Sequence, residues 1–399
     1  EQVAQAIAAA GGWLAFDHWM AMVLYTPGLG YYSGQRSPLG AQGDFVTAPE
    51  LSPLFGRVIG RQVAEWLRAM APEGPWQVLE FGAGSGALAA SLWPALVEAG
   101  TAPESYSVIE VSGLLRAQQA ATLEQRAPEA LAAVRWLETM PERFSGVVIA
   151  NEVLDAMPVR LFERIDMGWS ELGVVMDPAG MLRLAPMPLE MARPAPCGLP
   201  DPEGFSPGYR LEIAEQARAW IASLGSVLQR GAVLLFDYGF PAHELFHPQR
   251  AGGTLMAHYR HRAHTDLLAR PGLQDITAHV DFSAVAQAGV QAGLDLAGYT
   301  SQARFLLNCG LLEQAQGLLA EGGAANPATL RAMGAVQTLL SEAEMGELFK
   351  VIGFTRGLEA TPASSTGFLR GDRQMMLAAS EVQEDGATHR QTARREGQP

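Results

Sequence analysis

Two acidic residues lie three positions apart in NEVLDAMP, residues 151–158, directly after the apolar run GVVIA. An uninterrupted apolar run of this kind is typical of a buried strand in a parallel sheet. Ligands of such sheets bind beyond the carboxyl ends of the strands, so Glu152 and Asp155 are expected to meet a substrate there. If that substrate is a guanidinium, paired carboxylates can hold it in a fork geometry. The structural alternative is that Asn151 and Asp155 cap the turn and that Glu152 is solvated.

A glycine-rich turn occupies VLEFGAGSGALAA, residues 78–90, which reads as a strand, a turn and then a helix. Glycines remove side chains where a backbone must approach a ligand, and the following helix offers free N–H groups. The spacing Gly82-x-Gly84-x-x-Ala87 also satisfies the dinucleotide pattern, in which a pyrophosphate binds to that helix. The turn therefore predicts a nucleotide-like ligand without identifying it.

Two strand-end acids bear on the identity of that ligand. Glu80, two residues before the first glycine, is an awkward neighbour for a pyrophosphate but suits the ammonium and sulfonium groups of S-adenosylmethionine. Glu110 ends the strand SVIEV, where a carboxylate accepts hydrogen bonds from the ribose hydroxyls of either cofactor, unless it is an ordinary surface acid. S-adenosylmethionine is favoured over a nicotinamide cofactor, and the expected contacts are Glu80, Gly82, Ala83, Gly84, Gly86, Glu110 and Asn151.

Three further residues are secondary candidates for positioning the substrate. Asp237 in FDYG ends another predicted strand and is expected to face the same cleft. His279 and Asp281 in AHVDF could form an oriented acid–base pair, although a strand-end hydrogen bond explains them equally well. Asp44 lies in GDFVTAPELSPLFG, which we interpret as an arm that folds over the site and excludes water. The catalytic candidates are therefore Glu152, Asp155, Asp44, Asp237 and His279.

The segment GGTLMAHYRHRAH, residues 252–264, is expected to be a loop, and it carries three histidines spaced three apart, at His258, His261 and His264. Metal ligation is conceivable, but no fitting carboxylate or cysteine pattern accompanies them. Roles in facing the substrate or in structure are favoured, and no metal is expected.

The composition restricts the partners of the protein. Its 399 residues carry 28 Lys and Arg against 42 Asp and Glu, a net charge of −14, which disfavours binding to nucleic acid. Two cysteines without a C-x-x-C pattern fit a reducing compartment. No apolar run is long enough to span a bilayer, so no membrane insertion is expected. We expect a cytoplasmic protein of bacterial type, or a mitochondrial matrix protein if a targeting segment has been removed.

The pattern of elements predicts how these residues are positioned. Residues 1–75 contain a helical opening, a Gly/Tyr/Pro-rich loop and a helix over Pro53–Met70, and we interpret them as an arm or lid. From 76 to 380, strands alternate with helices, as in a parallel sheet covered on both faces. An insertion of short antiparallel strands and proline-rich chain at about 159–208 interrupts this pattern, and a helix over Tyr209–Gln229 follows. The polar tail, 381–399, is expected to be disordered.

Taken together, these segments resemble the MidA-like class I S-adenosylmethionine-dependent methyltransferases. The matching pieces are YTPGLGYYS, GDFVTAPELSPLFG, LEFGAGSGALA, YSVIEVS, NEVLDAMPVRLF, FDYG, GTLMAHYRHRAH, DITAHVDF, GYTSQARFL and MGELFKVIGF, in family order from about Tyr25 to Phe354. The resemblance implies an α/β, Rossmann-like fold with a seven-stranded sheet whose last strand is antiparallel. It also implies an N-terminal arm and an inserted β or irregular region.

The resemblance further implies a cofactor and a substrate. S-adenosylmethionine would contact Gly82, Gly84, Gly86 and Glu110. The known activity in the family is methylation of an arginine in a respiratory complex I subunit, producing symmetric dimethylarginine, so a protein arginine is the expected acceptor. The rival hypotheses are a non-catalytic S-adenosylmethionine-binding assembly factor, a small-molecule methyltransferase and a nicotinamide-dependent oxidoreductase. A homodimer formed through the inserted region is a further hypothesis that no sequence feature establishes.

Overall fold

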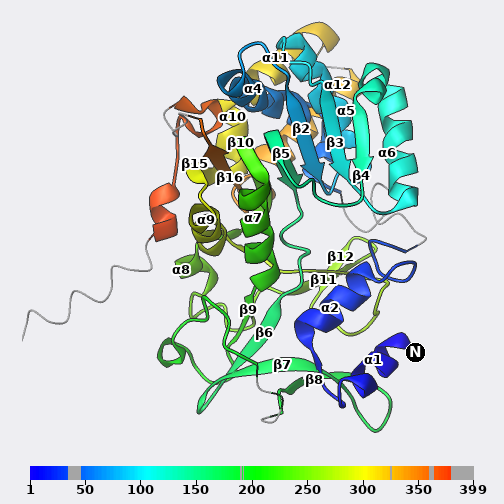
Figure 1. Cartoon of the computed structure of the whole chain (residues 1–399), viewed down its shortest axis with the longest axis vertical. Helices are drawn as coiled ribbons and strands as arrows, with labels where there is room; N and C mark the ends of the chain where they lie inside the picture. The colour runs from blue at the N-terminus through cyan, green and yellow to red at the C-terminus, as the bar shows by residue number, and fades with distance from the viewer. Residues whose placement is uncertain (35–45, 189–190, 192, 324–325, 359–363, 379–399) are drawn as a thin grey trace, which may run out of the picture.

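A central, mostly parallel sheet organises the molecule in the computed structural model, which describes residues 1–34, 46–188, 191, 193–323, 326–358 and 364–378 (Figure 1). Its strands are β2 (Gln77–Phe81), β3 (Ser105–Ile109), β4 (Val134–Leu137), β5 (Phe144–Asn151), β10 (Leu228–Phe240), β15 (Asp295–Ser301) and β16 (Phe349–Arg356). Their spatial order is β15-β16-β10-β5-β2-β3-β4, and β16 is antiparallel to both of its neighbours. The predicted seven-stranded sheet with an antiparallel last strand is confirmed. A two-residue strand, β14 (Val280–Asp281), pairs in addition with the end of β10.

Helices cover both faces of this sheet because successive side chains of a strand point to opposite sides. Along β10, Ala232, Leu234 and Phe236 belong to one apolar cluster, whereas Val233 and Leu235 belong to another. The first cluster contains helices α4 (Pro53–Met70), α5 (Ala87–Glu98), α6 (Gly113–Arg126), α10 (Gln302–Asn308), α11 (Leu311–Gly322) and α12 (Pro327–Leu340). The second contains α7 (Glu215–Val227) and α9 (Phe282–Gln291). The continuous apolar runs of the sequence are thus buried on both sides.

A second sheet lies below the central one in Figure 1. Its order is β1-β7-β6-β9, with β8 paired to β7, and its strands are β1 (Leu14–Ala15), β6 (Arg160–Ile165), β7 (Gly168–Met176), β8 (Leu182–Pro186) and β9 (Arg210–Ile213). Helices α1 (Gln2–Ala9) and α2 (Phe16–Tyr25) pack against it. A small third sheet consists of β11 (Met256–Tyr259), β12 (Arg262–His264) and β13 (Asp275–Thr277). The N-terminal residues and the inserted strands therefore share one sheet.

Two local predictions are wrong. The helix expected over Tyr209–Gln229 begins only at Glu215, because Arg210–Ile213 forms β9 and pairs with β6. There Leu211 and Ile213 are buried in an apolar cluster, and this tertiary packing outweighs the local helical preference. The segment 252–264, expected as a loop, contains the hairpin β11–β12. The domain boundaries at 75 and 208 remain predictions, and the tail 381–399 lies outside the described residues.

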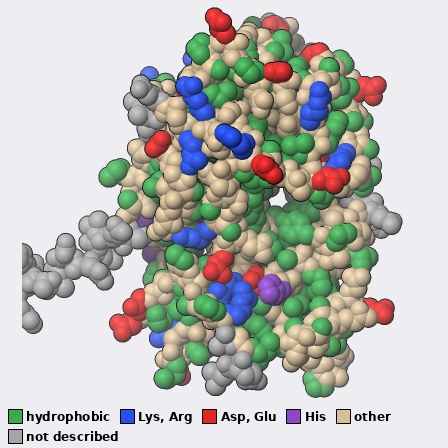
Figure 2. All heavy atoms as spheres, viewed as in Figure 1, with side chains coloured by type: hydrophobic (Ala, Val, Ile, Leu, Met, Phe, Trp, Pro, Cys, Tyr) green, Lys and Arg blue, Asp and Glu red, His purple; other side chains and the backbone are tan. Residues whose placement is uncertain are grey.

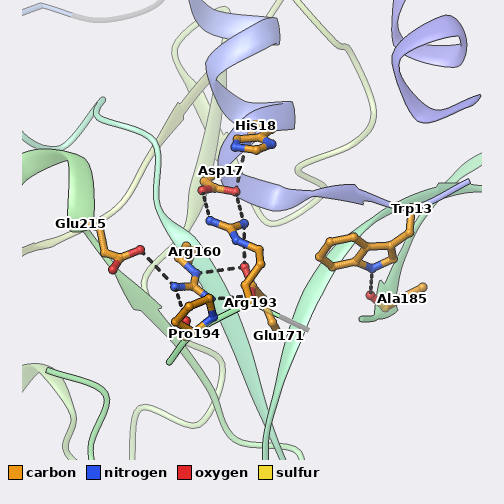
Figure 3. Close-up of polar contacts among 9 residues, drawn as sticks. All are labelled: Trp13, Asp17, His18, Arg160, Glu171, Ala185, Arg193, Pro194 and Glu215. Atoms are coloured by element: carbon orange, nitrogen blue, oxygen red, sulfur yellow. Dashed lines mark hydrogen bonds and ion pairs between the residues drawn. The ribbon is translucent and has the colours of Figure 1, made fainter. Parts of the chain in front are cut away.

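Ion pairs, partly buried, join α2 to the second sheet (Figure 3). The guanidinium of Arg160 bonds to Glu171 (Nη2–Oε2, 2.6 Å) and to Glu215 (Nη1–Oε2, 3.1 Å). Arg193 bonds to the same Glu171 (Nη1–Oε1, 3.0 Å) and to Asp17 (Nη2–Oδ2, 2.8 Å). The side chains of Arg160 and Glu171 are only 5% and 1% exposed. The network fixes the start of α2 against the inserted strands.

The surface has no single-sign field on the face drawn in Figure 2, where acidic and basic side chains are interspersed. That face is hollowed between the part that carries the central sheet and the part below it. Within the described ranges, no helix combines the length and the apolar character needed to cross a membrane.

Candidate active site

A cavity of about 620 Å³ lies at the carboxyl ends of β2, β3 and β5. Its wall is completed by the glycine turn, the segment after β5, the N-terminal region and the third sheet. Apart from His258 and His279, the Asp, Glu, Lys, Arg and His side chains that line it are all carboxylic acids, since no described Lys or Arg contributes to the wall. The acids are Glu50, Glu80, Glu110, Glu152, Asp155 and Asp275. A cavity of this sign favours cationic ligands and repels phosphates.

The glycine turn forms one end of the cavity. Gly82, Gly84 and Gly86 all have positive φ, at +64°, +54° and +84°, a region that L side chains rarely adopt. A Cβ atom on Gly82 would lie 2.6 Å from a methyl group of Val153, so the turn and the segment after β5 touch. Gly82, Ala83 and Gly84 line the cavity, whereas Gly86 precedes the first residue of α5 and lies close to α6. Contacts of these residues with a cofactor remain predictions.

Glu110 is held at the cavity wall by two hydrogen bonds. Its Oε1 accepts from the backbone N–H of Ser112 at 2.8 Å, and its Oε2 accepts from Nε2 of Gln119 at 3.2 Å. Gln119 also donates to the carbonyl of Gly84 at 3.0 Å. Gln119 thereby links the carboxylate of Glu110 to the glycine turn.

Glu80 reaches the cavity from within the sheet and is only 2% exposed. Its Oε2 accepts a hydrogen bond of 2.5 Å from the hydroxyl of Tyr106. Burial raises the pKa of Glu80 to about 7, although the bond from Tyr106 opposes that rise. A cation bound beside this carboxyl would stabilise its ionised form. The contact with the cationic end of S-adenosylmethionine stays a prediction.

These residues fit S-adenosylmethionine better than a nicotinamide dinucleotide. The turn allows close approach of a ligand, and Glu110 provides an acceptor for ribose hydroxyls. A pyrophosphate would meet acidic side chains with no described Lys or Arg in the cavity wall, whereas the sulfonium and ammonium groups of S-adenosylmethionine are both cationic.

Glu152 has a strained backbone at the end of β5. Its φ is +54°, and only Arg260 and His261 share a positive φ among the described non-glycine residues. The side chain lines the cavity and accepts a hydrogen bond of 3.0 Å from Nδ2 of Asn151. Burial, followed by the charge of Asp155, raises the pKa of Glu152 to about 8. Strain and an unfavourable charge at one residue are typical of a functional site.

Asp155 lines the cavity and has one carboxylate oxygen without a hydrogen-bond partner among the described residues. Its Oδ2 accepts a hydrogen bond of 2.5 Å from the hydroxyl of Tyr238, while its buried Oδ1 has no hydrogen-bond partner among the described residues. Burial raises its pKa to about 6, and the bond from Tyr238 opposes the rise. An unpaired buried acceptor is costly, so this oxygen is suited to a donor from a ligand.

Asp237 does not face the cavity as the sequence suggested. It is 1% exposed, and its Oδ2 accepts hydrogen bonds from the backbone N–H groups of Val153 at 3.1 Å and Leu154 at 2.8 Å. The carboxylate therefore supports the segment after β5 from behind. Its pKa is raised by burial and by the neighbouring charges of Asp155 and Glu152.

The histidine candidates have separate surroundings. His279 lines the cavity, but Asp281 caps α9 by accepting from the N–H of Ala284 at 3.0 Å instead of orienting it. Burial, reinforced by Arg250 and Lys350, lowers the pKa of His279 to about 4, so its ring is neutral near pH 7. His258 lines the cavity, and His261 lies in the turn of the hairpin β11–β12, with His264 in β12. In the described part of the chain, no cluster of His, Cys, Asp and Glu could hold a metal ion.

Sequence reasoning missed several residues of the wall. Tyr25 and Tyr32 flank the loop TPGLG, Asp275 begins β13, and Glu50 lies in the short helix α3 (Ala48–Leu51), where it bonds to Ser85 of the glycine turn. The motif YTPGLGYYS was the only signal for the tyrosines. Asp44 lies outside the described residues.

The fold and the acid-lined cavity define the class of the protein. Strand order, the glycine turn and the carboxylate after β3 are those of a class I S-adenosylmethionine-dependent methyltransferase. Residues 58–300 match the S-adenosyl-L-methionine-dependent methyltransferase family, and the chain belongs to this family.

Known relatives agree with this assignment. The mitochondrial protein arginine methyltransferase NDUFAF7 of Mus musculus is 31% identical over 364 residues, 85% of this chain and 80% of the relative. The protein of the same name from Danio rerio is 29% identical over 370 residues, 86% of this chain and 83% of the relative. A Burkholderia thailandensis protein, crystallised with S-adenosyl-homocysteine, is 49% identical with a TM-score of 0.86, over 94% of this chain and 95% of that chain. The predicted family, fold class and cofactor are thereby confirmed.

Proposed function

We propose that this methyltransferase modifies a guanidinium nitrogen of an arginine side chain in a protein. The observation that carries the proposal is the pair of carboxylates at the cavity wall beside the glycine turn, the half-buried Glu152 and the buried Asp155. The names of the NDUFAF7 relatives, which are protein arginine methyltransferases, support the same acceptor.

The raised pKa values of Glu152 and Asp155 support binding of a cation at this site. Desolvation raises the pKa of Glu152 to about 8 and that of Asp155 to about 6, and no described Lys or Arg in the cavity wall offsets the rise. A guanidinium placed beside them would favour their ionised forms and would be bound through charge-assisted hydrogen bonds. A neutral small molecule would leave the buried charges uncompensated.

The reaction requires two things of the chain: it must position the acceptor guanidinium, and it must accept the proton that the guanidinium loses. When bound, S-adenosylmethionine supplies a methyl group that is activated by a sulfonium. The carboxylates orient the guanidinium so that one nitrogen is held for attack. Methylation of a protonated guanidinium releases one proton overall, and the carboxylate of Glu152 is placed to take it. Asp237 keeps the backbone of this segment in place through Val153 and Leu154.

The decisive experiment follows a labelled methyl group into its acceptor. Purified protein, S-adenosylmethionine labelled in the methyl group and a cell lysate are incubated together, and the proteins are then hydrolysed for amino-acid analysis. Label in methylated arginine is expected. The identity of the labelled protein then shows whether the target is a respiratory complex I subunit. Glu152→Gln should lose the signal, while the exposed control Glu142→Gln should keep it. Label in small metabolites instead of protein would refute the proposal.

The location and oligomeric state remain predictions. The NDUFAF7 relatives are mitochondrial by name, whereas the cytoplasm is our expectation for this chain. A homodimer formed through the inserted region remains a hypothesis, and no observation on the described residues supports it.

A further inference from the structure

Two stacked tyrosines form a part of the cavity wall that has no role in the proposed function described above. Tyr25 ends α2 and Tyr32 follows in the next loop, and both line the cavity. Their ring centroids are 5.6 Å apart and their planes are inclined by only 19°. Tyr25 keeps 41% of its surface exposed, although its hydroxyl is part-buried and hydrogen-bonded within the protein. Both tyrosines contribute aromatic side chains to the wall of the cavity.

Hydrogen bonds place this aromatic surface next to the carboxylates. The hydroxyl of Tyr25 donates to the carbonyl of Ala156 at 2.8 Å, the residue directly after Asp155. The hydroxyl of Tyr32 donates to Oδ1 of Asp275 at 2.8 Å. Asp275 is 3% exposed and also lines the cavity. The N-terminal region and β13 thus reach the segment after β5 through tyrosine hydroxyls.

The charges of the aspartates act on the same two rings. Burial and the negative charges of Asp275 and Asp155 raise the pKa of Tyr25, and the same groups raise that of Tyr32. Both phenols therefore stay neutral, as donors and as aromatic surfaces. Asp155 adds its unpaired Oδ1, on a residue that is 5% exposed. A ligand here meets flat rings and a hydrogen-bond acceptor together.

A guanidinium matches this combination. It is planar, stacks on aromatic rings through its face, and donates hydrogen bonds to carboxylates in its plane. We propose that Tyr25 and Tyr32 form a stacking surface for the acceptor guanidinium, next to the free oxygen of Asp155. Asp275 positions Tyr32 and adds negative charge. The N-terminal region thereby contributes to selection of the acceptor. This inference rests on the proposed function.

The test measures binding of a guanidinium without turnover. N-acetyl-L-arginine N-methylamide is titrated calorimetrically into protein saturated with S-adenosyl-homocysteine. Removing one ring, in Tyr25→Leu or Tyr32→Leu, should weaken binding of this probe about 5- to 30-fold, the range for a desolvated cation–π contact. Tyr25→Phe keeps the ring and should bind within about 3-fold of the wild type. Asp275→Asn should weaken binding about 10-fold.

Three controls separate this role from a structural one. Phe246→Leu removes a partly buried ring away from the cavity and should leave the probe affinity unchanged. The affinity of every variant for S-adenosyl-homocysteine should equal that of the wild type, and N-acetyl-L-lysine N-methylamide should bind more weakly than the arginine probe.

Several results would overturn the inference. These are unchanged probe affinity in both leucine variants, a parallel loss of S-adenosyl-homocysteine affinity, equal binding of the lysine probe, or no binding of the arginine probe to the wild type. Its failure is distinguishable from failure of the proposed function. If methylarginine is labelled but the leucine variants bind the probe like the wild type, only the stacking surface is refuted. If no protein arginine is labelled, the proposed function itself is refuted.

Discussion

Replacing Glu152 by glutamine is expected to stabilise the ligand-free protein at neutral and higher pH while it removes most of the activity. Burial and the charge of Asp155 raise the pKa of Glu152 from 4.5 to about 8. Between these two pH values the folded protein holds a proton that the unfolded chain has lost. The free energy of unfolding therefore falls as the pH rises through this window.

The size of the effect follows from the window. One such group changes the free energy of unfolding by up to ~1.4 kcal/mol per pH unit. Between pH 6 and 7.5 the ionisable Glu152 should cost the wild type about 2 kcal/mol, a loss that the glutamine variant does not suffer. Because the variant lacks a carboxylate at the acceptor, its kcat should fall by about 100- to 1000-fold.

Urea unfolding at the two pH values measures the stability, and transfer of a labelled methyl group to protein measures kcat. The matched control is Glu142→Gln, since Glu142 is exposed and should leave both measurements unchanged. The reasoning fails if Glu152→Gln loses stability with pH as steeply as the wild type does. It also fails if the variant retains wild-type kcat.

Three further substitutions test the supporting structure. Gly82→Ala should weaken binding of S-adenosyl-homocysteine at least ~10-fold by calorimetry, because its φ is +64° and its Cβ would meet Val153 at 2.6 Å. Gly100→Ala, at φ +71° with open space around it, is the control. Asp237→Ala should lower the free energy of unfolding by about 1–3 kcal/mol and reduce kcat without altering cofactor affinity, because it leaves the backbone N–H groups of Val153, Leu154 and Asp155 without their acceptor. Arg160→Ala should lower the free energy of unfolding by about 3–5 kcal/mol, measured by thermal or urea unfolding, since it leaves Glu171 buried with fewer positive partners. Wild-type stability of Asp237→Ala or of Arg160→Ala would contradict the role assigned to the replaced residue.

Local patterns were sufficient for the sheet and for the two ends of the cavity. The apolar run before NEVLDAMP predicted a buried strand, and β5 has that form with Glu152 at its carboxyl end. The glycine spacing predicted close approach of backbone, and Gly82 and Gly84 line the cavity with positive φ. Both patterns involve neighbouring residues, whose conformations depend mainly on side-chain size and strand alternation.

Features that depend on contacts between distant segments could not be predicted. Tyr32 and Asp275 are 243 positions apart, and only the fold brings the phenol and the carboxylate together. The direction of Asp237 was misjudged because a strand-end acid can face a cleft or turn back to the N–H groups of a neighbouring turn. The strand at Arg210–Ile213 exists through pairing with β6, which its own sequence does not specify.

The central claim is that the acid-lined cavity binds a guanidinium because of its charge. It is tested most directly by titrating N-acetyl-L-arginine N-methylamide and its neutral citrulline counterpart into the wild-type protein saturated with S-adenosyl-homocysteine. The titrations are made at pH 7 in two buffers of different ionisation enthalpy, so that proton release can be measured. The arginine probe should bind at least ~10-fold more tightly than the citrulline probe. It should also release protons, because a bound cation lowers the raised pKa values of Glu152 and Asp155. Equal affinities, or arginine binding without proton release, would contradict the claim.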